Sequence, residues 1–322
     1  KKVHAIMESG AQDTYNAGHW SRLASWIDAL PPAVCQEHPR LLFFRAKVAI
    51  DTGDLENAGA LLDNAHDLYI DREDELGTAR VLVQQGVVQR LRGRMTEAIE
   101  FCEAALQRAE GRDPLVATQA HHNIGLDYAL QGDYGRAVDE LQSSLQFAEA
   151  NGDDTNAAFI ANDLATSEVN RGRLLAARKS YHQALLPWRR IGNPNGLAIA
   201  LQGLGMVHHY LGQYAEAENR FLESLEKALQ MDDKRVAAYA KASYGDLLRD
   251  TGRYDRALEA YQEAQEMATA THTTNLLIYV LASSSITYRF KGALADARRV
   301  LTEALDQTDP ARMVYETGLC YL

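Results

Sequence analysis

A glycine recurs along the sequence at intervals of 39 or 40 residues. The regular copies are Gly53, Gly93, Gly132, Gly172, Gly212, Gly252 and Gly292. Gly18, which lies 35 residues before Gly53, begins an eighth and less regular copy. A fixed period of this length is typical of repeat proteins, so the chain is expected to stack copies of one small unit.

Other positions keep the same register as the glycine. Alanine stands five residues after each of the seven regular glycines, and Ala or Ser stands twelve after them. The residue nine after is Leu, Cys or aromatic, and the residue seven before is Ala, Gly or Ser. Offsets of 5, 9 and 12 share one face of a helix, and small residues there let a second helix approach closely. Glycine suits the turn that ends the first helix, because it adopts the left-handed conformation without strain.

This pattern resembles the tetratricopeptide repeat, and it is fullest in LRDTGRYDRALEAYQEA at 248–264. That family has a small residue, a turn glycine, an alanine, an aromatic residue and a second alanine in this order, in a unit of about 34 residues. The unit here has about 40, so each helix is expected to gain about one turn. The resemblance implies an all-α protein. We expect an α-solenoid, a right-handed superhelix of about eight tetratricopeptide-like helix pairs without a β-sheet.

The whole chain, 1–322, is predicted to be a single domain of eight units. Their expected bounds are 1–32, 33–72, 73–112, 113–152, 153–192, 193–232, 233–272 and 273–308, with 309–322 as the start of a further helix. The segments between units carry turn and capping residues at 111–114, 151–155, 191–196, 231–234 and 271–274. Pro187 falls inside the second helix of unit five, where we expect it to bend the helix or end it early, with Trp188 covering the break.

Composition narrows the possible classes of protein. The formal net charge of −11 argues against direct contact of this segment with nucleic acid or with anionic lipid. No apolar run approaches the roughly 20 residues that cross a bilayer. Cys35, Cys102 and Cys320 are far apart, which is typical of free thiols in a reducing cytoplasm. The sequence begins Lys-Lys and stops within an expected helix, so we expect it to be a piece of a larger cytoplasmic protein.

The first unit carries a second, narrower resemblance. It has W-x-x-L-x-x-W-I-x-x-L-P followed by H-P-x-L, and the residues concerned are Trp20, Leu23, Trp26, Ile27, Leu30, Pro31, His38, Pro39 and Leu41. These residues resemble the sensor segment of MalT-like regulators, which are ATP-dependent LuxR-family transcription activators of the STAND class. The resemblance implies a segment that takes part in inducer binding and self-association. The phosphate-binding loop and the helix-turn-helix of such regulators are absent from this sequence.

Motifs for chemistry are sparse. His121-His122 and His208-His209 are adjacent pairs, and neighbours on a helix point about 100° apart, so neither pair forms one metal site. No H-E-x-x-H, nucleophile elbow, dinucleotide fingerprint or kinase motif is present. We therefore expect no enzyme activity, no metal and no cofactor.

A groove lined by the first helix of each unit is the expected binding surface. Counting from the small residue, groove-facing positions lie six and three before it and one and four after it. The candidate residues are Arg90, His122, Asn123, Phe159, Asn162, Gln202, His209, Tyr239, Asp246, Arg249, Tyr279 and Arg289. This mixture of aromatic rings and hydrogen-bonding groups suits a peptide, a polar small molecule or a sugar.

Two functions remain open from the sequence. One is the sensor and oligomerisation module of a MalT-like regulator, which binds a small inducer or a regulatory protein on the concave face of units four to seven. The other is a free-standing scaffold that binds peptide segments of partner proteins.

Overall fold

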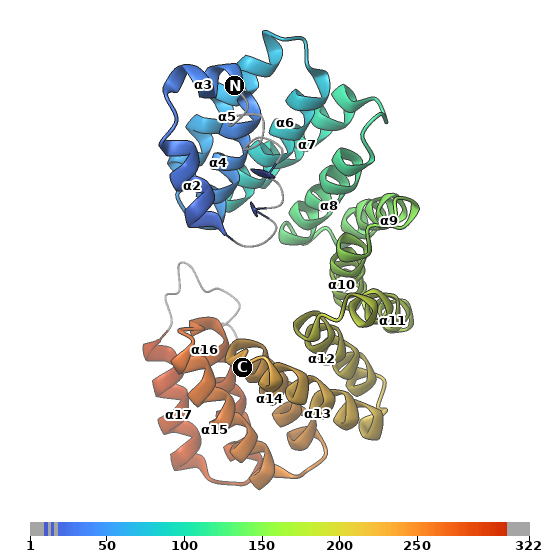
Figure 1. Cartoon of the computed structure of the whole chain (residues 1–322). Coiled ribbons are helices and arrows are strands. Elements are labelled where there is room, and N and C mark those ends of the chain that lie inside the picture. Colours follow the sequence, from blue (N-terminus) through green and yellow to red (C-terminus); the bar gives the residue numbers. More distant parts are fainter. Residues whose placement is uncertain (1–9, 12–13, 16–18, 308–322) are drawn as a thin grey trace. The chain divides into compact units, whose positions relative to one another are not determined.

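The computed structural model describes residues 10–11, 14–15 and 19–307 (Figure 1). Within these residues the protein is all-α, with sixteen helices from α2 to α17 and no strand, which confirms the predicted fold class. Gly18, Cys320 and the helix expected from 309 lie outside the described residues. The helices are α2 (Trp20–Asp28), α3 (Pro32–Glu37), α4 (Pro39–Asp51), α5 (Leu55–Ile70), α6 (Glu75–Leu91), α7 (Met95–Ala109), α8 (Pro114–Leu130), α9 (Tyr134–Ala150), α10 (Asp154–Asn170), α11 (Leu174–Ile191), α12 (Pro194–Tyr210), α13 (Tyr214–Gln230), α14 (Lys234–Asp250), α15 (Tyr254–Ala270), α16 (Thr274–Phe290) and α17 (Leu294–Asp306).

The chain divides into two compact units, residues 1–153 and 154–322. In the first unit, α4 pairs with α5, α6 with α7 and α8 with α9, while α2 packs on α4. In the second unit the pairs are α10–α11, α12–α13, α14–α15 and α16–α17. Within each unit, consecutive first helices of the pairs contact one another more closely than the second helices do. The first helices therefore form the inner face of each stack. The handedness of a superhelix and the eightfold division of one domain stay predictions.

The recurring glycines end the first helix of each pair, as the sequence predicts. Gly132, Gly212 and Gly252 have φ angles of +80°, +73° and +75°. The N–H of Gly252 bonds to the carbonyl of Arg249, and that of Arg253 bonds to the carbonyl of Leu248, which closes the turn. These left-handed residues reverse the chain in two or three residues and set the antiparallel pairing.

The alanines that follow the glycines form the contact between the two helices of a pair. Ala217 and Ala257 are fully buried, and so are Ala264 and Ser224 twelve residues after their glycines. The hydroxyl of Ser224 donates to the carbonyl of Ala198 on the preceding helix at 2.7 Å. Only small side chains fit here, because the backbones approach so closely that a side chain can reach the facing carbonyl.

Two of the contacts between successive pairs place a large ring near the end of the second helix, where other repeats have a small residue. Trp188 near the end of α11 lies over Gly196 of α12, where a Cβ atom would come within 2.4 Å of the indole ring. Tyr69 of α5 lies in the same way over Gly77 of α6, with a corresponding distance of 2.3 Å. In the third, fourth, sixth and seventh repeats this position of the second helix is alanine, as at Ala228. A large ring on one unit is thus accommodated by a glycine on the next.

The helix ends follow the expected capping residues in part. Asp113, Asn193 and Asp233 accept hydrogen bonds from N–H groups of the first turns of α8, α12 and α14, but Thr273 makes no such bond through its side chain. The expectation that Pro187 ends its helix early is wrong, because α11 continues to Ile191. The fully buried Trp188 beside it anchors this last turn.

Near the N-terminus, α4 begins at Pro39, and Leu23, Ile27 and Leu41 are buried. A short helix, α3, begins at Pro32, which the sequence reading did not predict. No helix among the described residues is long and apolar enough to cross a membrane.

Candidate functional site

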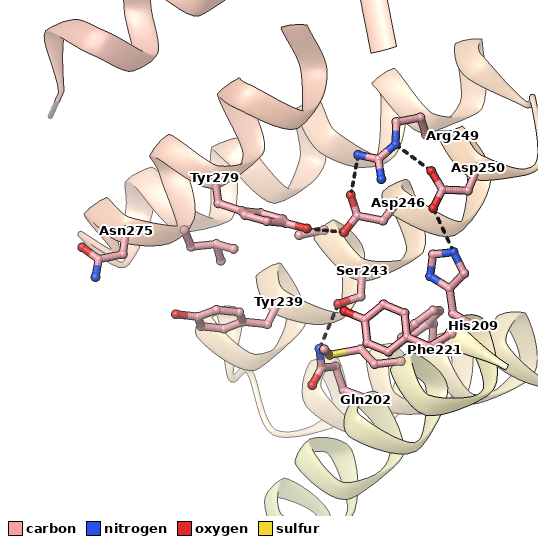
Figure 2. Close-up of a pocket in the computed structure, with 14 residues that line it drawn as sticks. Gln202, His209, Phe221, Tyr239, Ser243, Asp246, Arg249, Asp250, Asn275 and Tyr279 are labelled. Atoms are coloured by element: carbon pink, nitrogen blue, oxygen red, sulfur yellow. Dashed lines mark hydrogen bonds and ion pairs between the residues drawn. The ribbon is translucent and has the colours of Figure 1, made fainter. Parts of the chain in front are cut away.

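A cavity of about 430 Å³ opens on the inner face of the second unit (Figure 2). Its walls come from three successive first helices, α12, α14 and α16, and from the ring of Phe221 on α13. The lining residues are Gln202, Met206, His209, Tyr210, Phe221, Tyr239, Ala242, Ser243, Asp246, Arg249, Asp250, Asn275, Leu276 and Tyr279. This volume lies in the range of pockets that bind small molecules, about 300–1,000 Å³.

Asp246 accepts hydrogen bonds from three side chains, and Figure 2 shows two of them, those from Tyr279 and Arg249. The hydroxyl of Tyr279 donates to its Oδ2 at 2.6 Å, and the hydroxyl of Tyr261 donates to its Oδ1 at 2.7 Å. Nη1 of Arg249 also donates to Oδ1, at 3.0 Å. Burial raises the pKa of the Asp246 carboxyl, while Arg249 and the two hydroxyls oppose the rise. The three donors hold the carboxylate in one orientation and tie α14 to α15 and α16.

The network continues toward α12. Nε of Arg249 donates to Oδ1 of Asp250 at 2.8 Å, and Nε2 of His209 lies 3.1 Å from Oδ2 of the same carboxylate. Arg249 is therefore held between two carboxylates, Asp246 and Asp250. The rings of Tyr210 and Tyr214 pack against His209, with centroids at 5.9 and 6.0 Å. The polar floor of the cavity is thus a continuous chain of groups across three repeats.

Other polar groups of the cavity make fewer hydrogen bonds to the rest of the protein. Nε2 of Gln202 donates to Oγ of Ser243 at 2.8 Å, and it also lies 3.1 Å from Sδ of Met206. Tyr239 is 39% exposed, and neither its hydroxyl nor the Asn275 amide bonds to another described residue. These two groups and Oε1 of Gln202 are positioned to hydrogen-bond a ligand, while the aromatic rings supply apolar contact.

Six of the twelve predicted residues line this one cavity. They are Gln202, His209, Tyr239, Asp246, Arg249 and Tyr279. The cavity belongs to repeats six to eight, whereas the sequence predicted a surface on repeats four to seven.

The predicted residues of α10 and Arg289 lie outside the cavity lining. Phe159 is exposed and packs edge-on against Trp188, with centroids 4.7 Å apart. Asn162 is buried, and Arg289 lies near the end of α16.

The remaining three candidates belong to the first unit. Nη1 of Arg90 donates to Oδ1 of Asn123 at 2.7 Å and lies 3.9 Å from Oδ1 of Asp127. His122 is adjacent to Asn123 on α8. Asp127 is 0% exposed, and neither carboxylate oxygen accepts a hydrogen bond from a described residue, so burial raises its pKa to about 6 despite Arg90. Arg90 and Asn123 thus bridge α6 and α8 of the first unit.

The register rule missed several residues of the site, including Tyr261, which bonds to the lining residue Asp246, and two of the reasons can be read from the sequence. Phe221 belongs to a second helix, but Gly205 leaves its ring uncovered: a Cβ at Gly205 would lie 2.6 Å from Cε1 of Phe221. Tyr261 reaches Asp246 past Gly245 in the same way. An aromatic residue nine after the turn glycine, combined with glycine seven before it, is the signal. Asp250, Ser243 and Asn275 lie at other offsets and had no such signal.

Among the described residues, no group of three or more His, Cys, Asp or Glu side chains is arranged to hold a metal ion.

Comparisons with solved structures support the fold. A signal transduction ATPase with numerous domains (STAND) from Pyrococcus horikoshii, with a tetratricopeptide repeat sensor, matches 99% of this chain with a TM-score of 0.77 and 16% identity. The match covers 48% of that protein, so this chain spans about half of its length. The apo form of RapI matches 84% of this chain and 97% of its own, with a TM-score of 0.69 and 15% identity. A Rap protein complexed with Competence and Sporulation Factor matches 99% of this chain and 96% of its own, at 0.65 and 13%.

Sequence comparisons give the family directly. Among curated proteins, none matches the chain significantly. Two models of the tetratricopeptide repeat match residues 77–150, 154–230 and 203–270, which together are more than half of the sequence. These segments contain five of the seven regular turn glycines, from Gly93 to Gly252, the small residues at the crossings of the same repeats and most of the cavity. The chain belongs to the tetratricopeptide-repeat family of protein-interaction modules.

Proposed function

We propose that this chain is the signal-sensing and self-association module of a MalT-like transcriptional regulator, and that it binds a small inducer or a regulatory protein in the cavity on α12, α14 and α16. The observation that carries the proposal is the preformed cavity itself, which brings six predicted residues from three repeats together. The likeness in fold to a STAND protein with a tetratricopeptide repeat sensor agrees with the resemblance of the N-terminal segment, from Trp20 to Leu41, to the MalT-like sensor segment.

Binding of a ligand in this cavity can change the relative arrangement of the three repeats that line it, and so transmit a signal. Its polar chain joins α12 through His209, α14 through Asp246 and α16 through Tyr279. A ligand that contacts these helices together stabilises one arrangement of the three repeats over others. The module acts by binding and not by catalysis in this proposal.

A second candidate function is a free-standing scaffold that binds peptide segments. The observation that favours it is the match to the Rap protein complexed with Competence and Sporulation Factor, which extends over nearly the whole of both chains. The two candidates share the cavity and differ in the parts of the protein outside this segment. The full gene separates them, because a regulator carries a phosphate-binding loop before this segment and a helix-turn-helix after it.

The binding site is tested by ligand selection with wild-type and variant chains. A metabolite library and a peptide library are each passed over the immobilised chain, and retained compounds are identified by mass spectrometry and titrated by calorimetry. The variant Gln202→Ala/Tyr239→Ala removes a hydrogen-bonding group and an exposed ring without breaking the Asp246 network. We expect it to lose most of the affinity for any compound that the wild type retains.

The matched control is Leu222→Ala/Gln230→Ala on α13, which removes an exposed apolar group and an amide away from the cavity. Equal binding by the Gln202/Tyr239 variant and the wild type would place the site elsewhere. Replacing Arg249, although it is one of the groove residues predicted from the sequence, is a poor test. Arg249 bonds to the buried Asp246 and to Tyr261, so its removal also affects folding.

A further inference from the structure

A second groove lies on the other side of the last two repeats, away from the cavity. Its walls are the second helices α15 and α17, both labelled in Figure 1, and its floor is α16. Its volume is about 780 Å³. The lining residues are Asp255, Leu258, Glu259, Gln262, Gln265, Glu266, Thr269, Leu281, Ser284, Tyr288, Arg299, Val300 and Glu303.

The groove extends along almost the whole of α15. The lining residues from Asp255 to Thr269 recur every three or four positions, so they form one continuous face of that helix. At 1.5 Å per residue this face is about 21 Å long. A groove of this length accommodates a peptide segment and is longer than a small molecule.

Its charge is strongly one-sided. Four carboxylates line it, Asp255, Glu259, Glu266 and Glu303, against one guanidinium, that of Arg299. Asp255 bonds to Lys291, and Arg299 lies 3.5 Å from Asp296 outside the lining. The other three carboxylates have no cationic partner among the described residues.

Among the described residues, only neutral amides donate hydrogen bonds to two of those carboxylates. Gln262 and Gln265 donate to Glu266 and Glu303, each at 3.3 Å.

The floor supplies an independent sign of a binding surface. Ser284 is only 8% exposed and lines the groove, yet its hydroxyl has no hydrogen-bond partner among the described residues. A Ser or Thr hydroxyl within a helix can bond to a carbonyl of the preceding turn, as Thr287 does with Ser283 at 2.8 Å, so the Ser284 hydroxyl is left to bond a group in the groove. Leu281 and Val300 beside it offer apolar contact.

We propose that this groove binds a basic peptide segment of a partner protein. Lysine or arginine side chains spaced along the segment pair with Glu259, Glu266 and Glu303, an apolar side chain contacts Leu281 and Val300, and a polar group reaches Ser284. The site is separate from the cavity on α12, α14 and α16, so it stands or falls independently of the function proposed for that cavity.

The test measures fluorescence anisotropy of a labelled 15-residue peptide of lysine, leucine and alanine, with lysine at every fourth position, and of its glutamate counterpart. The full chain is compared with Glu259→Gln/Glu266→Gln/Glu303→Gln. The control, Glu97→Gln/Glu100→Gln/Glu103→Gln, removes the same charge from exposed positions of α7. Circular dichroism confirms that both variants keep their helicity.

We expect the lysine peptide to bind the wild type, and the glutamate peptide not to bind. The groove variant should raise the dissociation constant about fivefold or more, as expected for three exposed ion pairs, and the control less than about twofold. Equal losses in the two variants would show that only the net charge attracts the peptide, and would overturn the proposal. Failure of the lysine peptide to bind, or equal binding of the glutamate peptide, would overturn it as well.

Discussion

The hydroxyl of Tyr261 reaches the carboxylate of Asp246 by passing over Gly245, which has no side chain to obstruct it. The two oxygens are 2.7 Å apart, although Tyr261 belongs to α15 and Asp246 lines the cavity from α14. Gly245 is the small residue at the crossing of these two helices. One glycine therefore serves the packing of a repeat and the geometry of the binding cavity together.

Substitution of Gly245 by alanine should destabilise the protein. A Cβ atom there would lie 2.6 Å from Cε1 of Tyr261, so the ring must move out of a packed position. We expect a loss of about 1–3 kcal/mol in the free energy of unfolding, measured by urea denaturation. Gly135→Ala is the control, because its Cβ would meet only the side chain of Asp133 at 3.3 Å. Equal stability of Gly245→Ala and the wild type would show that the ring is free to move.

Removal of a single donor to Asp246 should also be costly. Tyr279→Phe leaves one oxygen of a buried carboxylate without its hydrogen bond, at an expected cost of about 1–3 kcal/mol. Tyr239→Phe makes the same chemical change on an exposed ring whose hydroxyl has no partner among the described residues, and should change stability by less than about 0.5 kcal/mol. Thermal and urea denaturation compare the pair. A similar cost for both would contradict the assigned hydrogen bond.

The pH dependence of stability should carry a contribution from Asp127. Its pKa is about 6 in the folded chain and about 3.9 when unfolded, so the folded state binds the proton more tightly. The contribution of this group to the free energy of unfolding therefore falls as the pH rises from about 4 to 6. Above about pH 6 the carboxylate is charged in the folded state, and its burial then destabilises the fold by the full amount. Asp127→Asn should gain about 1–3 kcal/mol relative to the wild type at pH 7.5, and this gain should shrink toward pH 4. A loss of stability in the variant at pH 7.5 would show that Arg90 depends on the carboxylate.

The alanines at the helix crossings should tolerate no larger side chain. Ala257→Leu inserts three carbon atoms into a fully buried contact between α14 and α15, at an expected cost of about 1–3 kcal/mol. Because a solenoid repeat contacts mainly its neighbours, hydrogen exchange should rise chiefly in α12 to α17. An unchanged melting profile, or exchange that rises equally in the first unit, would refute this assignment.

The fold followed from the sequence because its determinants are local and repeated. Gly252 marks a left-handed turn, and Ala257 marks a helix crossing. The interval of 39 or 40 residues between successive turn glycines then sets the combined length of the two helices in a repeat. The expectation that Pro187 ends its helix early was wrong for the opposite reason, because the effect of this proline depends on tertiary packing and not on local sequence alone. The burial of Trp188 outweighs the missing hydrogen bond, and α11 continues.

The cavity was predictable only in part. Positions such as Gln202, Asp246 and Tyr279 share a helix face that the register identifies. The register cannot show which repeats curve together closely enough to enclose a space. For that reason Phe159 and Asn162 have the expected offsets yet lie outside the cavity lining.

The rings of Tyr69 and Trp188 also give the repeats an order. Each ring needs a glycine at one place on the following repeat, and that place is Gly77 or Gly196; elsewhere it holds residues such as Val116, Asn156, Val236 and Leu276. A repeat without glycine at this place, set behind Trp188, would meet its indole with a side chain. The repeats are thus similar in sequence but not interchangeable in the stack. If recombination duplicated or reordered them in the gene, the resulting protein would pack well only where each large ring still faced a glycine.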